Sequence, residues 1–166
     1  KEAKKGETDE ILQETFLNLE KINNEKDLKK FEKKTWEKLS EIKIYEKKDV
    51  PKVGIVGEIY TVTDGAINFG IEEKLGREEI EVHREMDITY HLKKKIFPWK
   101  DWLIQRKINP YLRSTVGGHG RDAIYEMLEY IKKDFDGVIQ LLPFGCMAET
   151  AVRPILQKIH LEAGIP

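Results

Sequence analysis

The spacing of hydrophobic positions changes along the chain, and the first section has the spacing of a helix. Its apolar positions recur every three or four residues, at Leu12, Phe16, Leu19 and Ile22. Asn24 is a suitable N-cap for a second helix, with a looser apolar stripe. Residues 9–44 therefore predict a helical hairpin whose apolar side needs a partner surface. That surface is either the domain that follows or, alternatively, a further domain or subunit.

After Pro51 the pattern switches to short apolar runs. Residues 52–60 and 138–142 are apolar stretches that predict strands, and the second of them predicts a strand buried on both faces. Residues 79–83 alternate between polar and apolar and predict a third strand.

A helix is predicted between the first two strands. Thr61 or Thr63 can cap its start, and Gly76 can follow its end. Strand, helix and strand within about 30 residues form a βαβ unit with parallel strands and a right-handed crossover.

The connection to the last strand is long, about 50 residues against the dozen that a minimal crossover needs. Pro98 and Pro110 divide it into short helices near 88–96 and 99–107. Its aromatic residues predict either a small satellite core or a wall over the strand ends.

Two helices are predicted in the final third, the first of them directly after the glycine-rich turn at residues 114–120. The second contains Pro154, so it either kinks there or begins near Pro154 after a turn. Gly164 reads as its C-cap, and Ile165 and Pro166 read as the first residues of another strand. We therefore expect a fragment that is cut before a further strand.

These elements predict an α/β fold, a three-layer open parallel sheet of flavodoxin-like or Rossmann-like type in the order 2-1-3, with an N-terminal helical hairpin. Residues 1–50 form the helical extension and residues 51–166 the α/β domain.

Composition excludes several classes of function. The 29 Lys and Arg nearly balance the 30 Asp and Glu, so no nucleic-acid partner is expected. No apolar run reaches the length of a membrane span or forms a signal-peptide core. A single cysteine fits a reducing compartment, so we expect a cytoplasmic protein.

The candidate chemistry lies where the strands end. Glu58 and Tyr60 follow the first strand, and Cys146 follows the third. In the order 2-1-3 both turns flank the topological switch point, where open α/β sheets bind ligands. We expect Glu58 and Cys146 on one edge of the sheet, within about 10–15 Å.

Three roles are open for Cys146. It can be a buried structural thiol, a nucleophile that needs a base, or a metal or cluster ligand on a turn before a helix. A site with four thiolates needs more cysteines than this chain has.

Gly118, His119 and Gly120 open a helix, and backbone amides at such a position can hold a phosphate. Alternatively, the glycines only supply positive φ angles. Glu149, one turn after Cys146, is a further ligand-binding candidate or an acid that complements the helix dipole.

Three blocks, Val53–Tyr60, Val116–Gly120 and Asp136–Glu149, resemble the acyl-CoA dehydratase activase-related proteins (CoA-substrate-specific enzyme activases). These are similar to the iron–sulfur component of 2-hydroxyglutaryl-CoA dehydratases and benzoyl-CoA reductases. The resemblance covers residues 51–166, with Ala148 where many relatives have Pro.

The resemblance implies an oxygen-sensitive cytoplasmic protein of anaerobes that carries a 4Fe-4S or related cluster. It also implies an ATP-dependent activator protein as electron donor. Whether an acyl-CoA is a partner, and what the substrate and reaction are, stay open. Cys146 matches a cluster ligand, and the other ligands would lie outside this chain, which we expect to be inactive and cluster-free in isolation. A homodimer stays open. The alternative is a non-catalytic α/β module that binds a CoA-bearing or phosphate-bearing ligand or a protein partner.

Overall fold

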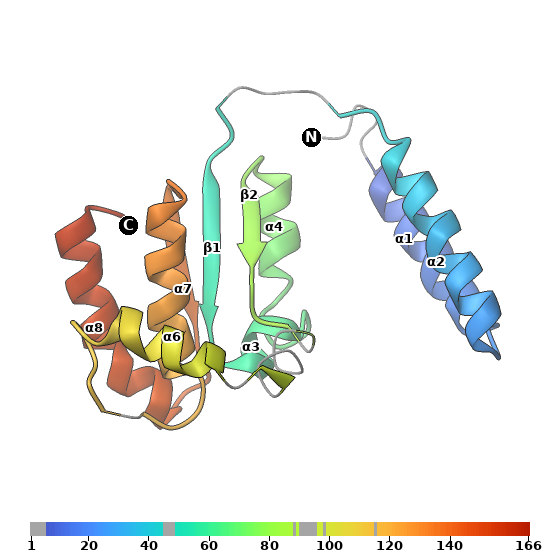
Figure 1. Cartoon of the computed structure of the whole chain (residues 1–166). Helices are drawn as coiled ribbons and strands as arrows, with labels where there is room; N and C mark the ends of the chain where they lie inside the picture. The colour runs from blue at the N-terminus through green and yellow to red at the C-terminus, as the bar shows by residue number, and fades with distance from the viewer. Residues whose placement is uncertain (1–5, 45–48, 88, 90–95, 98, 115) are drawn as a thin grey trace. The chain divides into compact units, whose positions relative to one another are not determined.

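The computed structural model describes residues 6–44, 49–87, 89, 96, 97, 99–114 and 116–166. The chain divides into two units, Lys1–Asp49 and Val50–Pro166. Figure 1 shows both of them.

The first unit is a helical hairpin. Helices α1 (Glu7–Leu19) and α2 (Glu25–Ser40) pack against each other. The Asn24 side chain accepts a hydrogen bond from the Asp27 N–H at 2.9 Å, which confirms the predicted N-cap. No residue of either helix is fully buried, and Phe16 and Trp36 are 66% and 65% exposed. What covers this apolar surface stays a prediction.

The second unit contains a parallel sheet of three strands among the described residues: β1 (Lys52–Gly57), β2 (Glu81–Arg84) and β3 (Gly137–Leu141). Their order is β2-β1-β3, so the predicted α/β fold and strand order are confirmed. The β1 and β2 arrows point the same way in Figure 1. Ile55 of β1 pairs with Arg84 on one side and with Ile139 on the other.

Helices cover both faces of this sheet. On one face lie α3 (Ile59–Thr63) and α4 (Ile71–Arg77). On the other lie α7 (Gly120–Lys132) and α8 (Met147–Ala163), with α6 (Trp99–Ile108) packed on α7.

Successive residues of β1 point to opposite faces, as a strand requires. Ile55 packs with Val62 and Met86 on the α3 and α4 side. The next residue, Val56, packs with Ala123 and Tyr130 of α7. The central strand is therefore buried on both sides. Residues 138–141 of β3, predicted to be buried on both faces, are only half-buried.

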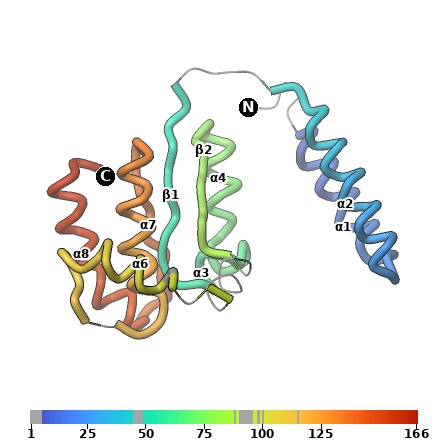
Figure 2. Tube along the Cα trace, viewed as in Figure 1, coloured from blue at the N-terminus to red at the C-terminus, as the bar shows by residue number. Residues whose placement is uncertain are grey.

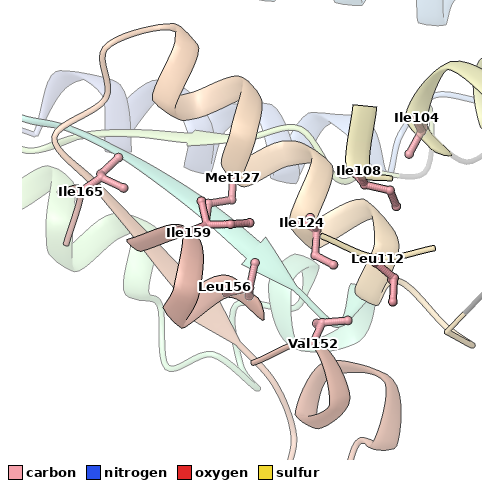
Figure 3. Close-up of a cluster of buried hydrophobic side chains, with 9 residues drawn as sticks. All are labelled: Ile104, Ile108, Leu112, Ile124, Met127, Val152, Leu156, Ile159 and Ile165. Atoms are coloured by element: carbon pink, nitrogen blue, oxygen red, sulfur yellow. The ribbon is translucent and has the colours of Figure 1, made fainter. Parts of the chain in front are cut away.

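The largest core cluster joins α6, α7 and α8 (Figure 3). Its buried residues are Ile104, Ile108, Leu112, Ile124, Met127, Val152, Leu156, Ile159 and Ile165. Helix α6, which matches the helix predicted at 99–107, therefore shares the core of its neighbours and forms no separate satellite. Trp99 and Trp102 on its outer side are 59% and 61% exposed. The helix predicted near 88–96 lies mainly outside the described residues.

The prediction of a single helix between β1 and β2 is wrong. The chain forms α3, a turn over residues 65–70, and then α4 (Figure 2). Asp64 causes the break, because its Oδ1 accepts the N–H groups of Ala66 and Ile67, at 2.8 and 3.2 Å, and so closes a turn. Glu58, and neither predicted threonine, caps α3, and Gly76 lies inside α4 instead of after its end.

Helix α8 runs through Pro154 without interruption, so the alternative of a helix that begins near this proline is wrong. Gly164 follows its last turn with φ of 69°, which confirms the predicted C-cap.

Candidate functional site at the carboxyl edge of the sheet

Strands β1 and β3 end side by side. Gly57, the last residue of β1, pairs with Leu141, the last residue of β3. The Glu58 N–H then donates a hydrogen bond to the Leu141 carbonyl at 2.9 Å. Glu58 and the turn that holds Cys146 consequently follow neighbouring strand ends, as the strand order predicts.

Glu58 is held rigidly at this edge by its role as the α3 cap. Its Oε2 accepts the Thr61 N–H at 3.0 Å and the Thr61 hydroxyl at 3.1 Å. Burial acts to raise the pKa of Glu58. This effect is outweighed by hydrogen bonds from the Thr61 and Tyr60 amides and the Thr61 hydroxyl, and by the charge of His119. The pKa of Glu58 therefore lies below its ordinary value. The Tyr60 side chain is 72% exposed beside it.

The glycines at the start of α7 allow two helices to approach each other closely. A Cβ on Gly118 would lie 3.0 Å from the Ala148 Cβ, and one on Gly120 would lie 2.8 Å from the Ala148 carbonyl oxygen. Gly118 also has a φ of 61°, which favours glycine. Packing of α7 against α8 thus explains both glycines without a ligand. His119 occupies the N-cap position and makes no side-chain cap.

Cys146 lies on a protruding turn directly before α8. Its N–H donates to the Pro143 carbonyl at 3.2 Å, and its own carbonyl accepts the Thr150 N–H at 2.9 Å. The side chain is half-buried and the thiol is free, while Phe144 is fully exposed and Met147 is 86% exposed. The residue is therefore not enclosed among aliphatic side chains, as a purely structural thiol would be.

Glu149, in the first turn of α8, is completely buried. Its Oε2 accepts a hydrogen bond from Nε2 of Gln140 at 2.8 Å, and that nitrogen also donates to the Glu149 carbonyl at 3.2 Å. Among the described residues Oε1 has no hydrogen-bond partner. Burial, together with the negative charges of Glu58 and Asp122, raises the pKa of Glu149, although the Gln140 hydrogen bond opposes this.

We expect the Glu149→Gln variant to change the dependence of stability on pH. A carboxyl group whose pKa is raised in the folded state contributes to the stability of the fold. This contribution is complete below the pKa of the unfolded state, about 4.5, and is lost as the pH rises through the pKa of the folded state. The wild-type protein should therefore lose stability relative to Glu149→Gln as the pH rises above about 4.5.

Urea unfolding across this pH range measures the difference. Glu78→Gln, at an exposed position after α4, is the matched control and should retain the wild-type slope. Parallel curves for wild type and Glu149→Gln would contradict a raised pKa at this site.

The edge thus gathers Glu58, His119, Cys146 and Glu149 from the ends of different elements. Two further residues belong to it, Gln140 and Asp122, which the sequence analysis did not identify. Gln140 could have been found, because it is the one polar residue in the apolar run of β3. Asp122 had no comparable signal, since an acid in the first turn of a helix is common.

The described part of the chain does not contain a full set of ligands for a metal ion or cluster. Among the described residues no three or more His, Cys, Asp or Glu side chains are grouped so that they could hold a metal ion. Cys146 can contribute a single thiolate, so any cluster there would need its other ligands from additional polypeptide or from small thiols.

Comparison of the chain with models of protein families, with curated proteins and with solved structures finds no match. None of the helices in the described part of the chain has the length and apolar character of a membrane span.

Proposed function

We propose that this chain is part of an iron–sulfur component of an electron-transfer or reductase-type system, in which Cys146 supplies one thiolate to the cluster. In this proposal the protein is cytoplasmic and works with an ATP-dependent activator, as the sequence resemblance implies. When bound, such a cluster would accept single electrons and pass them to the substrate.

The observation that carries the proposal is the setting of Cys146. Its half-buried, free thiol lies on an exposed turn at the carboxyl edge of a parallel sheet. It immediately precedes the 17-residue helix α8. Iron–sulfur clusters are held by cysteine thiolates, so a free thiol on an exposed turn can serve as a ligand.

The residues around Cys146 would hold this turn in place. Gln140 anchors the first turn of α8 to β3 through its two hydrogen bonds to Glu149. Gly120 lets α7 reach the Ala148 carbonyl. These contacts fix the start of α8, so a ligand at Cys146 would sit on a rigid support.

The test is anaerobic reconstitution with ferrous iron, sulfide and a small thiol that can supply the missing ligands. We expect wild type to bind iron and to develop the visible absorption of sulfide-to-iron charge transfer. Cys146→Ala should bind less iron than wild type by at least about tenfold. Thr150→Ala, at an exposed position in the first turn of α8, is the control and should bind iron like wild type. Equal iron in wild type and Cys146→Ala would refute the ligand role.

One observation favours a second candidate function, a non-catalytic module that docks a protein partner. Tyr60, Phe144 and Met147 follow neighbouring strand ends and are all highly exposed. Large exposed apolar side chains at one edge often mark interaction surfaces. If wild type binds no iron on reconstitution, and a partner protein is bound by wild type and Cys146→Ala but not by Phe144→Ala, this second function is the correct one.

A further inference from the structure

The outer edge of β3 is paired only at its start among the described residues. Its inner edge pairs with β1. On the opposite side the Val138 N–H donates to the Pro166 carbonyl at 2.9 Å. Ile165, just before it, is 6% exposed within the α6, α7 and α8 core. The residues after α8 are thus anchored against β3, in the place where the next strand of a parallel sheet begins.

The two outer strands of the sheet differ in character. β2 carries Glu81, His83 and Arg84, and charged side chains are a common protection of exposed sheet edges. Residues 137–142, which contain β3, carry no charge. An apolar edge without charges is expected where another strand covers it.

A groove of about 370 Å³ continues from Pro166 along this edge. Val138 and Gln140 of β3 line one side, and Leu156, Gln157 and His160 of α8 line the other. Its volume is within the range of clefts that bind ligands of moderate size.

We propose that this groove receives an extended apolar peptide strand, continuous with Pro166 and parallel to β3, which extends the sheet to four strands. The anchored carbonyl of Pro166 sets its direction, and α8 supplies one wall of the space. Pairing with β3 of a second copy would have to displace Pro166 from the Val138 amide.

Parallel pairing fixes the register of this strand. The second residue after Pro166 would donate its N–H to the Val138 carbonyl and accept the Gln140 N–H on its own carbonyl. Its side chains that face α8 should be apolar and β-branched, because α8 covers that face of the strand.

The test extends the 166-residue chain by four residues, Val-Val-Ile-Val, and compares it with the unextended chain. The matched control has proline as the second added residue, which removes the donor for the Val138 carbonyl. We expect the apolar extension to slow amide hydrogen exchange at Gln140 by at least about tenfold and to raise Tm by about 4 °C or more, with smaller effects for the proline control.

Three outcomes would overturn the proposal. Unchanged exchange at Gln140 would show that no strand adds to this edge. Equal protection with the proline control would show apolar covering without strand pairing. Protection that appears only with dimer formation in sedimentation would assign the edge to a second copy of the chain.

Discussion

Replacing Gly57 by alanine should destabilise the α/β unit more than any other substitution considered for this chain. Gly57 has a φ of 138°, a conformation that L-residues rarely adopt. A Cβ would lie 1.9 Å from the Leu141 carbonyl oxygen, which is backbone and cannot move aside without disrupting the pairing of β1 with β3. Strain and overpacking together should cost about 2–6 kcal/mol.

Urea unfolding of Gly57→Ala, followed by circular dichroism, measures this loss as a lower midpoint with an unchanged slope. Gly76→Ala is the matched control. Gly76 lies inside α4 with no atom within 4 Å of an added Cβ, so alanine there should stabilise by about 0.5–1 kcal/mol. If both variants unfolded at the wild-type midpoint, the close approach of Gly57 to Leu141 would be refuted.

Gly120→Ala should have the second-largest effect. An added Cβ would lie 2.8 Å from the Ala148 carbonyl oxygen and 2.9 Å from a Val152 methyl group. Because both belong to α8, the two helices would have to separate, at a cost of about 1–3 kcal/mol. The same shift would move the start of α8, next to Cys146, so iron binding in the reconstitution assay should also weaken.

Gly117→Ala tests whether this requirement is specific to Gly120. Gly117 belongs to the same glycine-rich turn, but no atom lies within 4 Å of an added Cβ. Its stability should therefore stay within about 0.5 kcal/mol of wild type. A ligand that binds the turn through its backbone amides would give a different result: both variants would lose its binding while stability changed little.

The spacing of apolar residues determined most of the fold. The runs at 52–60 and 138–142 place β1 and β3, and the helical spacing around Asn24 places α1 and α2. Such patterns are reliable because burial of one face is the main requirement on a strand or helix. The βαβ unit predicted the parallel arrangement of β1 and β2, and the order 2-1-3 was the flavodoxin-like expectation for such a sheet.

Local hydrogen bonds decided what the spacing could not. The sequence predicted one helix between β1 and β2, but the Asp64 carboxylate competes for backbone amides and divides it into α3 and α4. Pro154 indicated either a kink or a helix that starts near it. The second alternative is wrong, because Val152 and Leu156 on either side of Pro154 are buried in the core within one helix.

For the candidate site, the sequence by itself placed Glu58, His119, Cys146 and Glu149 at turns and helix starts, since apolar patterns locate the ends of strands and helices. Only the tertiary structure showed that Glu149 is completely buried against Gln140 and that the glycines before α7 serve helix packing. The physical reason is that burial, pKa and close approach depend on neighbours distant in sequence, which only the packing of α7 and α8 on β3 brings together.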